Sequence, residues 1–278
     1  MFPRLGHGFG LRPPHYRQVI DEQPPIGWLE LVTENFLVAG GPPRRVLEAA
    51  RARYPVVLHG VSLSIGSTDP LDERYLDALA GLVAEIEPAM VSDHLCWTSF
   101  GGHAAHDLWP LPYTDESLAL VVERVARVQD RLRRRILLEN PASYVTFVSS
   151  RLEEPDFLAE VARRADCGIV LDLGNLHVSA ANHGFEARDY LAPIPPERVG
   201  YFHLAGHDAD GGLLLDTHDA PVCQPVLDLY REALRRFGPV STLIEWDGEI
   251  PPLEGLIAEV DRARAVADAA LEETASGS

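Results

Sequence analysis

Seven side chains that can bind a metal ion each come directly after a short apolar run of the sequence. They are Glu34, His59, His94, Glu139, Asp172, His203 and Glu245. One such residue alone is more often a hydrogen-bonded group at the rim of a fold than a ligand. Seven together are a different case, because buried imidazoles and carboxylates are costly unless cations offset them. The pattern therefore predicts a metal site.

Two loop segments add further candidate ligands. Asn175 and His177 are two residues apart, and so are Asp216 and His218. In an extended chain, residues i and i+2 point to the same side, so each pair can hold one ion. The alternative for each pair is an ordinary solvated loop.

The candidates exceed the ligand positions around one ion, so we expect two or three ions. Glu139 is central in the strand order and is the candidate bridge, since a shared carboxylate lets two ions lie ~3.5–4 Å apart. Mixed imidazole and carboxylate ligands without a thiolate cluster favour Fe, Mn or Zn.

Four residues are candidates for substrate binding: His7, Arg12, Glu34 and His207. His7 and Arg12 flank the first apolar run and either hold a substrate carboxylate, which we favour, or close the floor of the fold. Glu34 ends the second run, and His207 lies in the loop after the seventh. Cys96 either faces the same cavity as His94 or, as free cysteines more often do, is buried as a small hydrophobe.

The apolar runs indicate β-strands that alternate with helices. The expected strands are 7–11, 27–34, 56–63, 89–95, 135–140, 168–173, 199–204 and 241–246. Segments 116–132 and 223–237 have the apolar spacing of helices. Eight strand–helix units in 278 residues predict an α/β fold, a TIM-like (β/α)8 barrel forming a single domain over 1–278, with its chemistry at the carboxyl ends of the strands. A six-stranded doubly wound sheet is the alternative. Residues 272–278 are expected to be a disordered tail.

Composition excludes several kinds of function. The formal net charge of −18 argues against a nucleic-acid partner and against an anionic membrane. All 24 basic residues are Arg, and without Lys neither Schiff-base chemistry nor a phosphate-binding P-loop can be built. Three cysteines without a C-x-x-C pair, and the lack of an apolar signal or membrane-spanning run, predict a cytoplasmic protein.

Twelve ordered segments of the chain together resemble one protein family. They are HGFGLR, VTENF, LHGVSLSIGS, VSDHLCW, DLWPLPYT, RVARVQDRL, ILLENPASY, LDLGN, VSAANHGF, HLAGH, DTHD and TLIEWD. In this set the chain resembles the multinuclear non-haem iron-dependent oxidative enzymes, a family that includes the methanobactin oxazolone-forming enzyme. The match runs from about residue 5 to about residue 265, and the family fold is a TIM-like barrel.

The resemblance implies an oxygen-dependent oxidoreductase that modifies cysteine residues of a ribosomally synthesised precursor peptide. Its cofactor would be two or three iron ions in mixed Fe(II)/Fe(III) states, with O2 as co-substrate. The cysteine-containing precursor would be its substrate, and a separate protein that binds the leader segment of that precursor is an expected partner.

The resemblance also assigns ligands position by position. One iron would be held by Glu139, Asp172, His203 and Glu245. The second would be held by His59 and His94, with Glu139 bridging, and the third by Asn175, His177, Asp216 and His218. The residues expected to act in catalysis are Glu139, His94, His59 and Asp172. The chain departs from the family pattern at Gly174 and His177, within the segment that would serve the third ion.

Three other functions stay open from the sequence. A divalent-metal sugar isomerase or epimerase uses a similar square of Glu, Asp, His and Glu, although the absence of Lys counts against it. A three-zinc barrel endonuclease is disfavoured by the acidic charge. A metal-buffering or structural protein would bind the ions without turnover.

Overall fold

The structure is a computed structural model that describes residues 2–276, except for the side chain of His106. Eight parallel strands form a closed barrel in the order β1–β12–β9–β8–β7–β4–β3–β2. They are β1 (His7–Gly10), β2 (Trp28–Val32), β3 (Val56–Gly60), β4 (Met90–His94), β7 (Leu137–Glu139), β8 (Gly168–Asp172), β9 (Val199–Leu204) and β12 (Ser241–Ile244). Each lies within one of the predicted strands, and the predicted TIM-like barrel is confirmed. The doubly wound alternative is wrong, because β1 pairs with both β2 and β12 and so closes the sheet.

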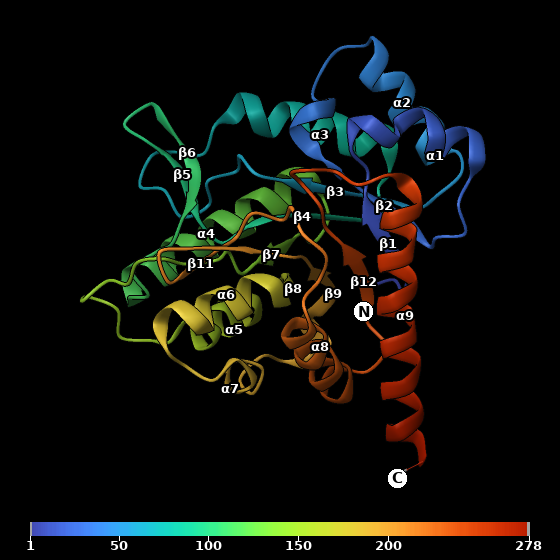
Figure 1. The fold of residues 1–278 in the computed structure, drawn as a ribbon. Coiled ribbons are helices and arrows are strands. Elements are labelled where there is room, and N and C mark those ends of the chain that lie inside the picture. Colours follow the sequence, from blue (N-terminus) through green and yellow to red (C-terminus); the bar gives the residue numbers. More distant parts are fainter. Residues whose placement is uncertain (1, 277–278) are drawn as a thin grey trace.

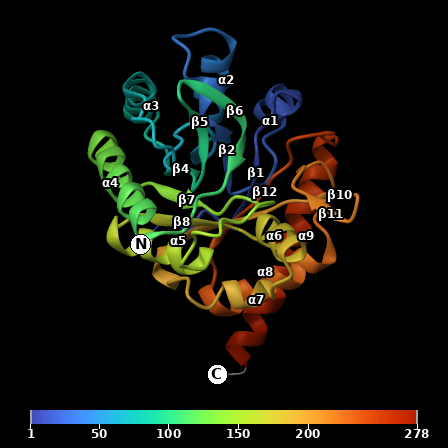
Figure 2. The same ribbon diagram turned by 90° about the vertical axis from the view of Figure 1, so that its left-hand side faces the viewer.

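Helices connect the strands and form a ring around the barrel (Figure 2). They are α1 (Tyr16–Glu22), α2 (Pro42–Arg51), α3 (Glu73–Ile86), α4 (Asp115–Leu132), α5 (Glu154–Arg164), α6 (Leu173–His183), α7 (Ala187–Tyr190), α8 (Gln224–Phe237) and α9 (Leu253–Ser276), with 3-10 turns η1 (Pro13–His15), η2 (Thr33–Phe36) and η3 (Pro196–Arg198). The long helix α9 lies against α8, β1 and β12 (Figure 1). The predicted helices 116–132 and 223–237 correspond to α4 and α8.

Local sequence signals explain where α4 begins and ends. The side chain of Thr114 accepts a hydrogen bond from the backbone N–H of Ser117, and the Ser117 side chain accepts one from the backbone N–H of Thr114. This reciprocal capping satisfies two donors that the helix itself cannot pair. Arg133 then ends the helix in the left-handed conformation, with φ of 53°. The helix therefore starts and stops where its sequence directs, and it returns the chain to β7.

The barrel interior is layered because strand side chains alternate in direction. Near the amino-terminal ends, the inward side chains are Trp28, Val57, Met90, Leu137, Val170, Tyr201 and Leu243. Two residues further along the same strands, the inward positions carry Glu30, His59, Ser92, Glu139, Asp172, His203 and Glu245, all of them buried. On β1 the apolar layer is completed by Gly8, where a Cβ would meet the carbonyl oxygen and the indole ring of Trp28. The apolar floor thus supports a polar layer at the mouth.

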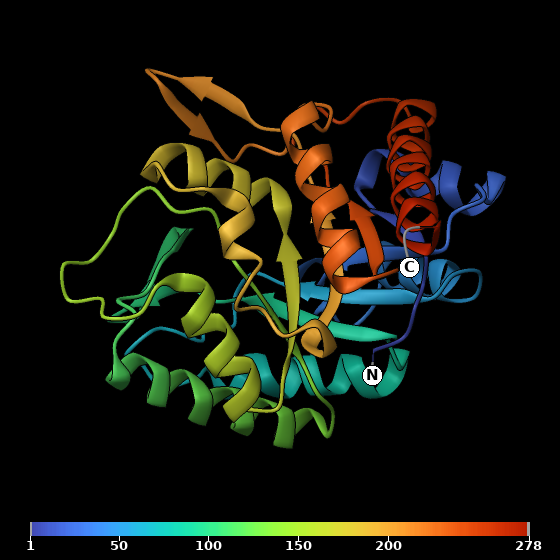
Figure 3. The same ribbon diagram turned by 90° about the horizontal axis from the view of Figure 1, so that it is seen from below.

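Two short β-hairpins, neither of them predicted from the sequence, extend from the mouth side of the barrel (Figures 1 and 3). The first consists of β5 (Trp97–Phe100) and β6 (His103–Trp109), and the second of β10 (Asp208–Asp210) and β11 (Leu213–Leu215). Their turns are Gly101-Gly102 and Gly211-Gly212, and all four glycines have positive φ. A Gly-Gly pair is the sequence signal for a two-residue hairpin turn, since both central positions need positive φ.

Two further expectations concern the ends of the chain and membranes. The helix α9 continues to Ser276, whereas a disordered tail is expected from residue 272; residues 277 and 278 lie outside the described part. Within residues 2–276, none of the helices combines the length and apolar character that crossing a bilayer would require.

Candidate metal centre

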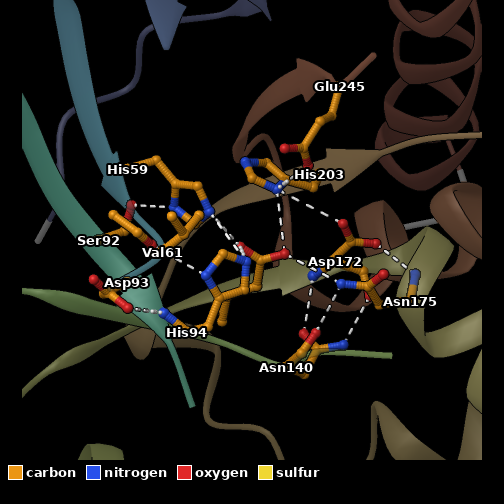
Figure 4. Close-up of polar contacts among 12 residues, drawn as sticks. His59, Val61, Ser92, Asp93, His94, Asn140, Asp172, Asn175, His203 and Glu245 are labelled. Atoms are coloured by element: carbon orange, nitrogen blue, oxygen red, sulfur yellow. Dashed lines mark hydrogen bonds and ion pairs between the residues drawn. The ribbon is translucent and has the colours of Figure 1, made fainter. Parts of the chain in front are cut away.

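The first cluster of potential ligands combines two histidines and one carboxylate. His59 on β3 and His94 on β4 direct their Nε2 atoms at each other, 3.3 Å apart. The rings of His59 and His94 lie next to each other in Figure 4. Glu139 Oε2 lies 3.1 Å from the Nε2 of His59 and 3.5 Å from that of His94. Two ring nitrogens and one carboxylate oxygen therefore point at one position, as around a bound ion.

The second cluster shares Glu139 with the first. It consists of Glu139, Asp172 and His203, on the neighbouring strands β7, β8 and β9, and of Glu245, which directly follows β12. His203 Nδ1 lies 3.4 Å from Glu139 Oε1, 3.6 Å from Asp172 Oδ2 and 2.9 Å from Glu245 Oε2. Because one oxygen of Glu139 faces each cluster, its carboxylate has the placement of a bridging ligand.

The third cluster shares Glu245 with the second. It consists of His218, Glu245 and Asp247. His218 Nδ1 lies 3.5 Å from Glu245 Oε2 and 3.5 Å from Asp247 Oδ2, while its Nε2 lies 2.6 Å from Asp216 Oδ1. The predicted pair Asp216 and His218 is thus brought together, although Asp216 contacts the ring nitrogen that faces away from the cluster.

The positive charge of protonated histidines offsets the negative charge of the carboxylates they contact. Burial by itself would lower the pKa of His59, but the carboxylates of Glu30 and Glu139 outweigh it and raise the pKa to about 9. Burial would also lower the pKa of His203, but the neighbouring carboxylates, with Glu30 as the strongest, raise it well above its ordinary value. Burial lowers the pKa of His94. In Glu139 burial opposes ionisation, yet the neighbouring histidines hold the pKa well below its usual range. Metal ions would take the place of the imidazole protons.

Several atoms of the clusters point inward with their hydrogen-bonding capacity unused. Among residues 2–276, Glu139 Oε2, Asp172 Oδ2 and His203 Nδ1 are buried without a hydrogen bond of good geometry. Burial raises the pKa of Asp172 to about 6, since its carboxylate lies beside Glu139 in a site closed to water. Leaving such groups unpaired is costly, whereas cations bound at the first and second clusters would satisfy all of them. The residues therefore fit a group of bound transition-metal ions.

Glu30, rather than Glu34, is the carboxylate that β2 directs into the barrel. Glu30 is 1 % exposed and lies 3.1 Å from Nε2 of His203, a contact that orients the ring. Glu34 lies in η2 and accepts hydrogen bonds from the Val61 backbone and from the Tyr75 hydroxyl, at 2.9 and 2.7 Å. Glu34 is the last acidic residue of the apolar run. However, side chains along β2 alternate in direction, and because Trp28 faces the barrel interior, Glu30 faces it as well. Glu34 joins a loop to a helix and does not belong to the clusters.

His7 and Arg12 lie at opposite ends of β1. His7 starts the strand, at the floor of the barrel, where its Nε2 lies 3.1 Å from the Tyr230 hydroxyl and burial lowers its pKa to about 4. This position at the floor, away from the mouth, agrees with the alternative role of His7 in closing the floor rather than with substrate binding. Arg12 follows the strand at the mouth and donates hydrogen bonds to Asp247 at 2.8 and 2.5 Å, with Glu245 at 3.5 Å.

Asn175 and His177 do not act as a pair. Their segment is the first part of α6, not an extended loop, and in a helix residues i and i+2 point in different directions. Asn175 donates a hydrogen bond to Glu139 Oε1 at 3.3 Å, so it supports the bridging carboxylate. His177 turns away and lies against His207, with 5.0 Å between the ring centroids. Cys96 is fully buried, and burial holds the pKa of its thiol well above its ordinary value.

A buried hydroxyl pair positions His59. Ser92 Oγ lies 2.8 Å from His59 Nδ1 and 2.6 Å from the Tyr201 hydroxyl. This contact fixes the ring so that Nε2 faces His94 and Glu139.

Replacing Ser92 with Ala is expected to weaken metal binding at the first cluster by about 10- to 100-fold, the usual effect of losing a group that orients a ligand. Metal titration in competition with a chelator would measure it. Tyr201→Phe is the matched control, because it keeps the Ser92 contact with His59, and its affinity should change less. Equal metal affinity in the wild type and Ser92→Ala would contradict the role of Ser92.

Asp93 points outward from β4, and its protonation makes the stability of the metal-free protein depend on pH. Burial and the charge of Glu34 raise the pKa of Asp93 to about 8, although backbone N–H groups of His94 and Leu63 donate to it. Between the unfolded pKa of ~3.9 and a pH of about 8, the folded state keeps a proton that the unfolded state releases. Stability should therefore fall as pH rises through this window and level off above it.

Urea unfolding of chelator-treated protein at several pH values would test this, with Asp93→Asn as the comparison. The free energy of unfolding of the wild type should decline relative to that of the variant, by on the order of a few kcal/mol across the window. A difference between the two proteins that does not change with pH would refute the assignment to Asp93.

Two cavities lie next to each other at the mouth. One of about 220 Å³ is lined by members of all three clusters together with Arg12, Asp107 and Tyr144. A second, of about 850 Å³, lies beside it between the loop after β7 and α7 and contains none of the cluster residues. One loop borders both cavities, since its Tyr144 lines the first, and its Val145 and Phe147 line the second.

The fold and the site define a TIM barrel with three linked groups of potential metal ligands at its mouth. Solved structures of this fold include D-psicose 3-epimerase from Clostridium cellulolyticum H10, with TM-score 0.60, 12 % identity and coverage of 98 % of each chain. Endonuclease IV from Thermus thermophilus also matches, with TM-score 0.60, 18 % identity and coverage of 98 % of this chain and 100 % of the other. At such low identity these likenesses establish the fold alone.

Sequence comparison identifies the family within this class. Residues 6–268 match the family model of the RiPP precursor modification enzymes MbnB/TglH/ChrH, and the chain belongs to this family. RiPPs are ribosomally synthesised and post-translationally modified peptides. A UPF0276 protein of Anaeromyxobacter sp. (strain Fw109-5) is 57 % identical over 98 % of this chain and 96 % of its own. A UPF0276 protein of Caulobacter vibrioides is 52 % identical over 95 % and 94 %. The resemblance found in the sequence is confirmed, and with it an enzyme family that acts on peptide precursors.

Proposed function

We propose that this protein is a multinuclear non-haem iron enzyme that uses O2 to modify cysteine residues of a ribosomally synthesised precursor peptide. The observation that carries the proposal is the sharing of Glu139 and Glu245 between neighbouring ligand clusters, which suits two or three ions in a row. Membership in the family supports the peptide substrate. The cytoplasmic location expected from the cysteine usage is part of the same proposal.

The residues that would hold iron are those of the three clusters. Bound iron, in mixed Fe(II)/Fe(III) states, would supply the redox chemistry and a Lewis acid for a cysteine thiolate. The chain provides a dry site, because His59, Glu139, Asp172 and His203 are each no more than 2 % exposed. A water-excluded site strengthens electrostatic interactions and protects reactive species.

Arg12 is the residue we assign to holding the substrate at the mouth. Its guanidinium is fixed by Asp247 and Glu245, and within the described residues its buried Nη1 has no hydrogen-bond partner. A peptide carbonyl or carboxylate entering the 220 Å³ cavity would accept a hydrogen bond from this nitrogen. The adjoining 850 Å³ cavity, with Val145, Phe147 and Phe185 in its walls, is the place for residues that flank the cysteine. A separate protein that binds the leader segment is the proposed partner.

Co-expression with a short cysteine-bearing open reading frame next to the gene tests the proposal. Mass spectrometry should show an oxidative mass change at the cysteine, absent when that cysteine is replaced by Ser and absent with Glu139→Gln enzyme. Metal analysis of aerobically purified protein discriminates the alternatives: iron with visible absorption supports the oxidative enzyme, zinc alone the nuclease-like function, and colourless Mg or Mn the isomerase-like function. An unmodified peptide together with iron-free protein would overturn the proposal.

A further inference from the structure

A fourth group of potential metal ligands lies apart from the barrel centre. His177 on α6, His207 in the loop after β9 and Cys223 at the start of α8 place their ligand atoms within 4.8 Å of one another. Cys223 Sγ lies 4.0 Å from His207 Nδ1, and the rings of His177 and His207 lie with centroids 5.0 Å apart, tilted by 48°. Three separate elements of the fold therefore bring one thiol and two imidazoles together.

The chemistry of this group differs from that of the barrel centre. It contains no carboxylate, whereas each cluster at the mouth contains at least one. A thiolate with two imidazoles suits Zn²⁺ and disfavours Mg²⁺ and Ca²⁺, which prefer oxygen ligands. Three protein ligands leave one position of a tetrahedral ion open.

The surroundings favour binding of an ion rather than burial of inert side chains. All three residues are partly exposed, so an ion can reach them, in contrast to the fully buried Cys96 and Cys167. Cys223 is the N-cap residue of α8, so its thiol lies at the start of a helix and outside the barrel core.

We propose that His177, His207 and Cys223 form a second, independent metal site that binds one Zn²⁺ ion, with water in the open position. The ion would tie α6 to α8 at the outer edge of the mouth. The site does not depend on the identity of the metal at the barrel centre, because it shares no ligand with the three clusters there.

Titration of the purified full-length protein with Zn²⁺ and, in parallel, with Co²⁺ tests the proposal. The wild type should bind one equivalent of Zn²⁺ beyond the metal of the barrel centre, and bound Co²⁺ should show thiolate-to-metal charge-transfer absorption. Cys223→Ser should lose this absorption and bind Zn²⁺ at least about 10-fold more weakly. His177→Gln should also weaken binding, so the test does not depend on one variant.

Two controls separate this site from the barrel centre. Cys96→Ala removes the buried thiol two residues after His94 and should retain the absorption. Glu139→Gln disrupts the barrel centre and should retain it as well. The proposal is overturned if the wild type takes up no additional Zn²⁺, or if folded Cys223→Ser, verified by circular dichroism, keeps the charge-transfer band at full intensity.

Discussion

Replacing Glu139 with Gln is expected to empty two metal positions at once and to reduce activity by more than about 100-fold. The reason is geometric. Glu139 Oε2 faces His59 and His94, and Oε1 faces His203, so one carboxylate serves both clusters. Gln has nearly the same volume but no charge, so it can neither bridge two cations nor keep the three histidines balanced.

Metal analysis of the variant, measured per folded chain, provides the test. Asp247→Asn is the matched control, because Asp247 belongs to the third cluster alone and its loss should affect one ion. If Glu139→Gln protein retained both ions at full occupancy, Glu139 would not be a bridge, and the assignment of the first two clusters to neighbouring ions would have to be abandoned.

Removal of the bound metal is expected to lower the melting temperature by roughly 8–16 °C. A ligand present at about 1,000 times its Kd stabilises the folded state by about 4 kcal/mol. In a domain of this size, each kcal/mol corresponds to about 2–4 °C. The structure supports an effect of this size, because Glu139, Asp172 and Glu245 converge inside the barrel, and a buried oxygen of Glu139 and one of Asp172 have, in the described part of the chain, no hydrogen-bond partner that could replace a cation.

Thermal unfolding followed by circular dichroism, before and after treatment with a chelator, measures the shift, and adding the metal back should restore the original value. In Glu139→Gln protein, which should already lack two of the ions, the chelator should have a much smaller effect. A wild-type melting temperature that does not respond to the chelator would argue against ions bound at the centre of the barrel.

The barrel itself could be predicted from the sequence because its signals are local. Each strand is a short apolar run, each helix has three- and four-residue apolar spacing, and eight such units leave few alternatives. His59, Glu139 and His203 can be found because they follow their runs directly. The two hairpins are harder to predict, although Gly101-Gly102 and Gly211-Gly212 mark them, since their strands are only three to seven residues long.

The errors at the site arise where the direction of a side chain depends on the fold. The end of the second apolar run suggests Glu34 as the site residue, because the run alone does not show which of its residues face the barrel interior. The two-residue alternation that starts at Trp28 does show this, and it identifies Glu30. The pairing of His177 with Asn175 is wrong because it assumes an extended chain at the start of α6. Asp247, like Glu30, could have been found only by assigning each strand its inward face and following it to the mouth.

Glu139 and Glu245 each belong to two of the clusters, and this restricts how such an enzyme can evolve. An exchange at either position that adjusts the properties of one ion must also suit its neighbour, so changes inside the barrel come as coupled sets. The hairpins and the loop that carries Tyr144 and Phe147 are free of this restriction. New peptide specificities are therefore expected to arise from the rim, while the interior keeps its composition.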